Sequence, residues 1–568
     1  MRFKEVTIKN YRSFNNEGIN VEFPEIPYPI SIVGYNNSGK SNIINGILNA
    51  CGYKPYGYHY SENDFYFKDV SKKAEVKLLF DEYFTVPTIY PEGSDKKCFG
   101  CSLELKSEED GSILGFTHAL DEKLELIVTQ ERIKARAIPV TMSKHKEKLN
   151  LFYIDYQNLS KHLKISSSSL LGKAMEEIKK DFKKDTNLVK NVKEEDISRN
   201  DYFNKLLDFI ENNLLKTPKF SEFISSLEDQ VKKQLFLDSD SVNITFSLPK
   251  SDEIYDSMEF MLSDNKTKPP IPLEQLGEGF KALLIIAILR TLLKTDEGGK
   301  IILLEEPETY LHEHFQEYFY NILCELAKKN QVIYTTHSKK FVNIFIPESI
   351  IRVQNPEYLY SKIVQNKGPK IDYPEEVNGF KFSDPSQFPK YLRTLEPNIG
   401  NLIFANKVII VEGPHDLLAY KYALSQVFNF EANNTAILAA WGKDPIISLI
   451  QLCQRYQIEF YVIHDWDLSN NDLDIYQEPK SYNKYALLPS EEKSQFTKNF
   501  KIASQINDRS KLHHNKLKLE SVLRIKDSDK GAMSVFNALE KKNLKEIMTA
   551  FPEFINNSLL DFLQIPIF

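Results

Sequence analysis

The stretch Ile30-Ser31-Ile32-Val33-Gly34-Tyr35-Asn36-Asn37-Ser38-Gly39-Lys40-Ser41 decides the fold of the first part of this chain. Residues 30–33 predict a short buried strand, and residues 41–50 have the pattern of a helix. A strand, a glycine-rich loop and a helix in this order make a phosphate-binding loop, whose backbone N–H groups surround phosphate oxygens. The residues expected to contact the nucleotide are Gly34, Asn36, Asn37, Gly39, Lys40 and Ser41. Lys40 is expected to reach the β- and γ-phosphates and Ser41 to bind Mg²⁺, so ATP with Mg²⁺ is the predicted cofactor.

Two later strands are expected to complete this nucleotide site. The run Ile301-Ile302-Leu303-Leu304 predicts a buried parallel strand that ends at Glu305 and Glu306. Ligands bind at the carboxyl ends of such strands. Glu305 is therefore expected to support the Mg²⁺ ion, and Glu306 to position or deprotonate the attacking water. The strand predicted at 331–335 is followed by His337, which we interpret as a sensor of the γ-phosphate.

Two further motifs resemble those of ABC-type ATPases. Gly277-Glu278-Gly279 opens an apolar helix and resembles the signature motif, in which a helix N-terminus binds the γ-phosphate held by a partner subunit. This resemblance implies that Gly277 and Gly279 contact ATP sandwiched between two copies of the chain. Gly277 replaces the usual serine, and Glu305 replaces the usual aspartate.

Residues 10–14, Asn-Tyr-Arg-Ser-Phe, resemble the N-terminal strand motif of the RecF and OLD group of these ATPases. The resemblance implies that Arg12 lies near the nucleotide. The alternative for Arg12 is a solvated strand end.

A second group of acidic residues lies far downstream. The apolar run Val408-Ile409-Ile410-Val411 ends at Glu412-Gly413. Asp416 lies four residues after Glu412, in the first turn of the helix expected next, so it is expected to share a face with Glu412. The run Phe460-Tyr461-Val462-Ile463 is a second expected strand, which ends at Asp465 and Asp467, and alternate residues there are expected on the same side. If both runs are neighbouring buried strands, these carboxylates converge at one sheet edge. Such oxygen donors suit Mg²⁺ or Mn²⁺, and two ions about 4 Å apart support phosphodiester cleavage.

A Glu-Gly strand end followed by Asp-x-Asp resembles the Toprim domain of topoisomerases, primases and some nucleases. With the ATPase motifs ahead of it, the chain resembles the OLD (overcoming lysogenization defect) family of ATP-dependent endonucleases. That family includes the nuclease subunit of the Gabija antiphage system and retron-associated OLD nucleases. The resemblance covers about 1–50 and 270–530. It implies a divalent-metal-dependent DNA endonuclease under ATP control, with a role in antiphage defence.

The family's later motif is an acidic pair followed by a lysine. Its nearest match here is Lys518-Leu519-Glu520 with Lys530, so a lysine stands at the first acidic position. The resemblance implies that Glu520 is a metal ligand and that Lys530 stabilises charge on the scissile phosphate. Gly442-Lys443 is either a loop beside this site or a surface turn.

At 568 residues the chain is expected to form more than one domain. We predict an α/β protein in which an ABC-type ATPase domain with a helical insertion precedes a C-terminal Toprim domain. The predicted boundaries are 1–165 and 236–395 for the two parts of the ATPase domain, 166–235 for an insertion that serves dimerisation, and 396–568 for the Toprim domain.

The composition of the chain bears on its binding to nucleic acid, its redox environment and its contact with membranes. The net charge of −7, from 72 basic and 79 acidic residues, argues against a general electrostatic grip on nucleic acid and leaves room for a local basic groove. Five cysteines and no apolar leader predict a reduced, cytoplasmic protein. The longest apolar run, 282–293, is shorter than the roughly 20 residues that span a bilayer. No membrane partner is therefore expected.

Two function classes remain open from sequence. The first is an ATP-regulated DNA endonuclease that forms a homodimer or higher oligomer through its ATPase domain. The second is an ATP-switched DNA-binding or scaffold protein of the RecF kind, with a degenerate Toprim domain, which the replacement at Lys518 keeps open. A helicase-like protein, or a retron reverse transcriptase with its nucleic acid, is a further partner that the family resemblance implies.

Overall fold

The computed structural model describes residues 1–568 apart from 54–58, 88–94, 131–136, 165–168, 176–208, 211, 214–216, 236–242, 248–258, 265–266, 295–298, 356–358, 366–370, 378, 385–386, 527–530, 541, 552 and 567–568. The chain forms two compact units. Unit 1 comprises Met1–Ile32, Asn36–Phe341 and Asn355–Lys362. Unit 2 comprises Val33–Tyr35, Val342–Gln354 and Ile363–Phe568. The mixed α/β fold class predicted from sequence is confirmed.

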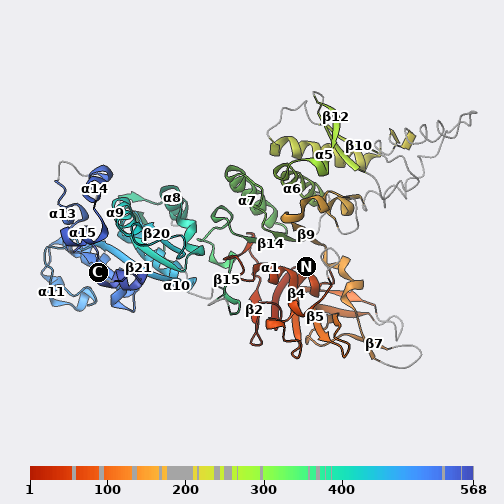
Figure 1. Ribbon diagram of the computed structural model, residues 1–568, viewed down its shortest axis with the longest axis horizontal. Helices are drawn as coiled ribbons and strands as arrows, with labels where there is room; N and C mark the ends of the chain where they lie inside the picture. The colour runs from red at the N-terminus through yellow and green to blue at the C-terminus, as the bar shows by residue number, and fades with distance from the viewer. Residues whose placement is uncertain are drawn as a thin grey trace, which may run out of the picture. The chain divides into compact units, whose positions relative to one another are not determined.

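A sheet that contains parallel strand pairs carries the phosphate-binding loop. Its strand β13 (Ile301–Glu305) pairs in parallel with β14 (Gln331–Thr336) and β9 (Leu151–Asp155), so that Glu305 stands beside Thr335 and Asp155. In the same sheet β3 (Ile30–Gly34) neighbours β14, and α1 (Lys40–Ala50) follows the loop (Figure 1). Strands β13 and β14 are buried along their whole length, which explains the apolar runs at 301–304 and 332–334.

An antiparallel sheet forms the rest of the N-terminal part of unit 1. Its order is β2-β1-β4-β5-β6, and the bounds are β1 (Phe3–Lys9), β2 (Ile19–Glu22), β4 (Ala74–Val86), β5 (Lys96–Ser107) and β6 (Ile113–Leu120). Buried and more exposed residues alternate along the first half of β4, as expected for a sheet with one covered face.

Helices cover the parallel sheet of unit 1. Helix α6 (Glu278–Lys294) is buried through its middle, because residues 282–289 are all apolar and all enclosed. Helix α7 (Glu313–Ala327) packs against β14, and α5 (Pro218–Leu235) packs against α6. A three-stranded sheet, β10 (Asn243–Ser247), β11 (Glu259–Asp264) and β12 (Thr267–Pro272), lies in the same part of the chain. Much of the insertion predicted at 166–235 falls outside the described residues.

Unit 2 is built on a four-stranded sheet of order β20-β19-β21-β22, in which every pair is parallel. The strands are β19 (Lys407–Val411), β20 (Thr435–Ala439), β21 (Glu459–Asp465) and β22 (Leu512–Asn515). Val411 stands beside both Ala439 and Ile463. The carboxyl ends of three strands therefore meet at one edge of this sheet.

Both faces of this sheet are buried. Alternate residues of β19 enter separate cores, with Val408 and Ile410 in one and Ile409 and Val411 in the other. Helices α10 (Lys443–Arg455) and α12 (Ser490–Ser504) line the first core. The second core is lined by α9 (Pro414–Ser425), α14 (Ala532–Leu539), α15 (Leu544–Ala550) and α16 (Asn557–Leu563).

Shorter elements complete the described chain. They are β7 (Val128–Gln130), β8 (Ala137–Pro139), α2 (Leu159–His162), β15 (Ile350–Gln354), β16 (Lys362–Gln365), β17 (Glu376–Val377), β18 (Phe380–Lys381), α8 (Phe388–Leu395), α11 (Asn483–Ala486) and α13 (Leu519–Val522). Within the described ranges, no helix combines the length and the apolar character needed to cross a bilayer.

Arg352 is a buried cation that joins three backbone segments of unit 2. Its guanidinium donates to the carbonyl oxygens of Ile403 (3.1 Å), Ala405 (2.7 Å) and Tyr456 (2.9 Å). Burial lowers the pKa of Arg352 to about 10.

We expect Arg352→Met to destabilise unit 2 by about 3 kcal/mol, because three buried carbonyls lose their donors. Scanning calorimetry of the full chain measures the shift, with Arg393→Met on α8 as the matched control. Equal unfolding temperatures for the two variants would contradict this role.

Candidate active sites

The phosphate-binding loop enters α1 through a glycine that no other residue can replace without strain. Gly39 has φ 104°, in the left-handed region. A Cβ atom at Gly39 would lie 2.4 Å from Ser361 Oγ and 2.6 Å from Ser13 Oγ. The backbone of the loop is therefore closely enclosed at Gly39.

Lys40 and three glutamates form the charged centre of the nucleotide site. Lys40 is almost fully buried, and burial lowers its pKa to about 8, while the charges of Glu306, Glu308 and Glu305 act in the opposite direction. A buried cation facing several carboxylates is suited to meet the negative charge of a triphosphate together with a metal ion.

Ser41 and Glu305 lie together, as the sequence predicted for a shared Mg²⁺ ligand shell. The Ser41 hydroxyl hydrogen-bonds to the Glu305 carboxylate, and the Tyr153 hydroxyl donates to Glu305 Oε2 at 2.8 Å. Burial raises the pKa of Glu305. A hydroxyl and a carboxylate side by side fit the hard oxygen ligands that Mg²⁺ takes alongside nucleotide phosphates. The roles of both residues stay predictions.

Glu306 and His337 lie on neighbouring strand ends and face each other. His337 Nε2 is 3.6 Å from Glu306 Oε1, and this contact is the largest cause of a lowered pKa at Glu306. Glu306 has φ 48°, and its N–H donates to Thr335 Oγ1 at 3.1 Å. Glu308 accepts the backbone N–H of His337 at 2.6 Å. An ionised Glu306 is the state required of a group that orients or deprotonates water.

The sequence reasoning missed Gln157. Its side-chain amide donates to Glu306 Oε2 at 3.1 Å, from the turn that directly follows β9. Gln157 is therefore a positioning residue for Glu306. The signal was present in the sequence, because residues 151–155 form an apolar run that ends in an acid just before Gln157.

Arg12 lies one contact away from the phosphate-binding loop. Its guanidinium pairs with Asp64 (Nε to Oδ1, 3.0 Å) and donates to Asn42 Oδ1 at 3.3 Å, in the first turn of α1. Gly277 and Gly279 lie at the N-terminus of α6, and a Cβ at Gly277 would meet nothing within 4 Å. The predicted nucleotide contacts of all three residues stay predictions.

The carboxylates of unit 2 gather where the parallel strands end. Glu412 follows β19, and its Oε2 accepts the backbone N–H of Asp465, the last residue of β21, at 3.0 Å. Asp416 caps α9 by accepting the Gly413 N–H at 2.9 Å. Asp416 therefore joins Glu412 through a helix cap, and the helix-face spacing expected from sequence is not the cause.

Asp467 also lies near these carboxylates, but strand alternation, as expected from sequence, does not put it there. Strand β21 ends at Asp465, so strand alternation does not extend to Asp467, which has φ 52° in the left-handed region. A turn directs its carboxylate toward Lys443, whose Nζ lies 2.9 Å from Asp467 Oδ2.

Crowding of these carboxylates shifts their protonation. Burial, followed by repulsion from Asp416, Glu412 and Asp467, raises the pKa of Asp465 to about 8. Burial and the neighbouring acids also raise the pKa of Asp416 to about 7, and burial raises that of Glu412. A divalent cation would relieve this repulsion, so the donor set fits a metal such as Mg²⁺.

In the described part of the chain, no three His, Cys, Asp or Glu side chains are already arranged to hold a metal ion. Three of the carboxylates are engaged by other groups: Glu412 by a backbone N–H, Asp416 by its helix cap and Asp467 by a lysine. A metal at Asp467 would have to compete with the lysine contact.

Glu520 and Lys518 lie near different members of this group. Glu520, on α13, is 3.5 Å from His415 Nδ1, and its charge contributes to the raised pKa of Asp416. Lys518 Nζ lies 3.9 Å from Asp467 Oδ1, so this lysine lies close to a proposed metal ligand. Lys530, the predicted catalytic lysine, lies outside the described residues.

Metal affinity at this site is expected to rise with pH. The folded metal-free protein binds protons at Asp416 and Asp465 more tightly than the unfolded chain does. The protonated carboxyl groups of Asp416 and Asp465 therefore stabilise the folded metal-free protein at low pH. This stabilisation is lost as the pH rises through their pKa values of about 7 and about 8. Because a metal binds the ionised carboxylates, its affinity should increase at least about tenfold between about pH 6 and pH 8. Calorimetric Mn²⁺ titration at the two pH values tests this, and a pH-independent affinity would contradict it.

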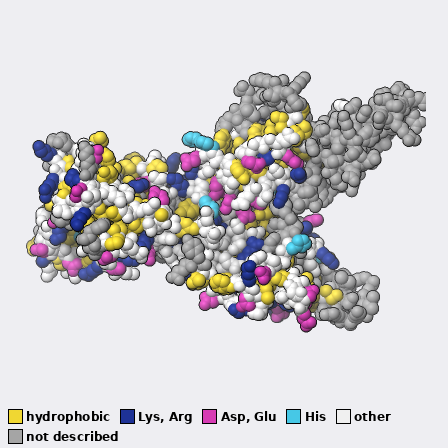
Figure 2. Space-filling view, in the orientation of Figure 1, with side chains coloured by type: hydrophobic (Ala, Val, Ile, Leu, Met, Phe, Trp, Pro, Cys, Tyr) yellow, Lys and Arg dark blue, Asp and Glu magenta, His cyan; other side chains and the backbone are white. Residues whose placement is uncertain are grey.

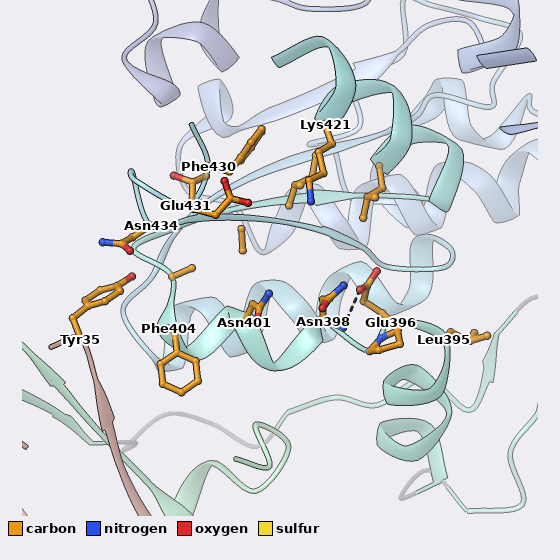
Figure 3. Close-up of a pocket in the computed structure, with 16 residues that line it drawn as sticks. Tyr35, Leu395, Glu396, Asn398, Asn401, Phe404, Lys421, Phe430, Glu431 and Asn434 are labelled. Carbon is orange, nitrogen blue, oxygen red and sulfur yellow. Dashed lines mark hydrogen bonds between the residues drawn. The ribbon is translucent and has the colours of Figure 1, made fainter. Parts of the chain in front are cut away.

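A hollow of about 480 Å³ lies at the opposite ends of the same strands. Figure 3 shows Tyr35, Phe404 and Asn434 around it, together with the hydrogen bond between Asn398 and Glu396 (3.2 Å). Its wall includes the start of β20 and residues just before β19. Since these strands end at the carboxylates, the hollow is separate from the proposed metal site.

The fold and these two sites define an ATPase joined to a Toprim nuclease. The model of the AAA ATPase domain family matches residues 1–342, more than half of the chain, and the model of the "overcoming lysogenization defect protein-like, TOPRIM domain" matches residues 403–467. The chain therefore belongs to this ATPase family and, with its OLD-like Toprim domain, to the OLD family of ATPase-linked nucleases.

Two curated relatives are similar over most of their length. An OLD nuclease of Thermus scotoductus is 24% identical over 477 residues, which cover 82% of each chain. Endonuclease GajA of Bacillus cereus is 22% identical over 461 residues, covering 78% of this chain and 71% of the relative. Among solved structures, an SMC head bound to the C-winged helix domain of ScpA aligns with 64% of this chain, at 17% identity and a TM-score of 0.39.

Proposed function

We propose that this protein is an ATP-regulated DNA endonuclease that uses Mg²⁺ or Mn²⁺ at Glu412, Asp416, Asp465, Asp467 and Glu520. The observation that carries the proposal is the convergence of Glu412 and Asp465 at adjacent strand ends, with Glu412 bonded to the backbone of Asp465. This convergence lies within the segment that matches the OLD-like Toprim model.

The chemistry proposed for this site is hydrolysis of a phosphodiester bond. Bound divalent ions supply an activated water and stabilise charge on the leaving oxygen. The chain's own part is to hold the carboxylates at fixed strand and helix ends, close enough that their repulsion favours a cation. Lys530 is proposed to stabilise charge at the scissile phosphate.

We expect DNA to be bound by individual basic side chains and not by one large basic surface. On the face drawn in Figure 2, lysine and arginine side chains are interspersed with acidic ones, and no continuous basic area covers the described residues there. The net charge of −7 agrees with this view. Weak general attraction to DNA is therefore expected, with strong dependence of binding on salt where contacts form.

The ATPase unit is proposed to control cleavage through a sandwich dimer. Gly277 and Gly279, at the N-terminus of α6, would contact the γ-phosphate on the partner subunit, while Lys40, Ser41 and Glu305 hold the nucleotide in their own subunit. We also propose a cytoplasmic location. A part in antiphage defence is a further proposal, which similarity to endonuclease GajA supports. A helicase-like or retron partner is proposed on the family resemblance alone.

The test is cleavage of supercoiled plasmid by the full chain with Mg²⁺ or Mn²⁺, with and without ATP. Cleavage that stops when EDTA removes the metal and returns when the metal is restored supports the proposal. ATP-dependent DNA binding without cleavage under all of these conditions would favour the scaffold alternative. Lys518, at the place of an expected acid and 3.9 Å from Asp467, is the feature that keeps this alternative open.

A further inference from the structure

Lys443 is an unusual residue for the place that it occupies. Its side chain is only 3% exposed, although lysine is rarely buried without a partner. It is also the first residue of α10, and the N-terminus of a helix favours negative charge. Burial and the helix dipole both disfavour an ammonium group here, so compensating contacts must hold it.

The compensation comes from the carboxylate centre of unit 2. Lys443 Nζ is 2.9 Å from Asp467 Oδ2, and it also contacts Gln495 Oε1 at 3.5 Å. Its charge is the largest influence that lowers the pKa of Glu412, against the larger effect of burial. Lys443 therefore acts electrostatically on at least two of the proposed metal ligands.

The local backbone is built to bring Lys443 to this position. Trp441 has φ 63° and Gly442 has φ 130°, both in the left-handed region. The Gly442 N–H donates to the carbonyl oxygen of Glu412 at 2.9 Å, so the loop is tied to the strand end that carries the first carboxylate. Because β20 ends beside β19, the helix that follows β20 must begin at this edge of the sheet.

We propose that Lys443 is the internal counter-cation of the carboxylate centre. Its ammonium group holds Asp467 in the metal-free protein and opposes the entry of a divalent ion, and so Lys443 sets the metal concentration at which the site loads. The proposal rests on the proposed function, since it assumes that these carboxylates bind the metal. It makes Lys443 a positioning residue, which acts on the site through Asp467.

The charges predict the direction of the effect. A divalent ion at these carboxylates and the ammonium group compete for the same negative charge, and they repel each other in a partly buried site. Removing the ammonium while keeping the aliphatic stem, as in Lys443→Met, should therefore strengthen binding of Mn²⁺ at least about tenfold. The metal concentration for half-maximal DNA cleavage should fall by a similar factor.

The experiment is a Mn²⁺ titration of the full chain without nucleotide, followed by the electron paramagnetic resonance signal of free Mn²⁺. Lys498→Met is the matched control. Lys498 lies near the same site, but its side chain is 36% exposed and pairs with Asp444, so solvent screens its charge. This control should change the Mn²⁺ affinity less than about threefold. Lys443→Gln provides a second uncharged variant if Lys443→Met unfolds.

Glu412→Gln, titrated in parallel, separates failure of this inference from failure of the proposed function. If Glu412→Gln removes the tight Mn²⁺ site, and the neutral variants at position 443 bind Mn²⁺ no tighter than wild type, only the counter-cation role is overturned. If Glu412→Gln leaves Mn²⁺ binding unchanged, the metal site itself is wrong and the inference falls with it. Tighter binding in the 443 variants and unchanged binding in Lys498→Met support the role of Lys443.

Discussion

Replacing Glu412 by Gln is expected to reduce DNA cleavage by at least about 1,000-fold, which corresponds to about 4 kcal/mol of transition-state stabilisation. Glu412 follows β19, and its carboxylate accepts the backbone N–H of Asp465, so it belongs to the proposed donor set. Gln keeps an oxygen that accepts from the Asp465 N–H and removes only the charge. The loss should therefore reflect metal binding and chemistry, with the fold retained.

Stability should move in the opposite direction. The pKa of Glu412 is raised, which means that its charge is unfavourable in the folded metal-free protein. Neutralising it relieves repulsion with Asp467 and the other acids, so the thermal midpoint without metal is expected to stay the same or to rise at neutral pH. Plasmid-cleavage rates and melting curves of the same preparation measure both effects.

The matched control for this prediction is Asp444→Asn. Asp444 lies in the first turn of α10, next in sequence to Lys443, and its carboxylate pairs with Lys498 Nζ at 2.7 Å. It has no part in the proposed donor set, so its replacement should leave the cleavage rate within about threefold of wild type. Wild-type cleavage by Glu412→Gln would contradict the Toprim assignment of this site. Lost cleavage with a collapsed melting curve would show that Glu412 is structural.

The second large effect is expected at Lys40. Lys40→Met should weaken ATP binding at least about 100-fold, because the variant keeps the buried stem but loses the ammonium that faces Glu305, Glu306 and Glu308. Without that cation, three carboxylates face the phosphates unopposed. Binding of a fluorescent ATP analogue measures the loss, and Lys340→Met, on a lysine that pairs with Glu313 at 3.7 Å, is the control.

The cleavage rate of Lys40→Met also shows how ATP regulates the nuclease. Faster cleavage than wild type in the presence of ATP would mean that bound nucleotide restrains the Toprim site. Slower cleavage would mean that nucleotide activates it. ATP affinity equal to wild type would contradict the assignment of the phosphate-binding loop.

The nucleotide site could be predicted in detail because its residues are consecutive. The loop from Gly34 to Ser41 carries its own geometry, since a strand, a glycine loop and a helix are local structures. Glu305 and Glu306 could be placed beside it because parallel strands share one carboxyl edge. Gln157 depends on the neighbouring strand β9 and was found only in the folded chain.

For the carboxylate site, the sequence explained the placement of only some of the residues. Apolar runs that end in acids were enough to predict Glu412 and Asp465 at one sheet edge, because buried parallel strands need both apolar faces and a common edge. The sequence argument failed in its reasons for Asp467 and Asp416. A left-handed turn and a helix cap place those two residues, and such backbone geometry is chosen by tertiary packing.

The sequence alone therefore determined the class of fold and the order of the ATPase and Toprim domains. It also predicted the acidic and phosphate-binding residues, since these follow from local periodicity and short motifs. Only the tertiary structure decided which charges oppose one another. Lys443 is the clearest case. From sequence its Gly-Lys pair was equally a surface turn, and in the folded chain the parallel register of β20 and β19 buries it 2.9 Å from Asp467. Charge pairing across 24 residues of sequence depends on strand order and burial, which no local pattern encodes.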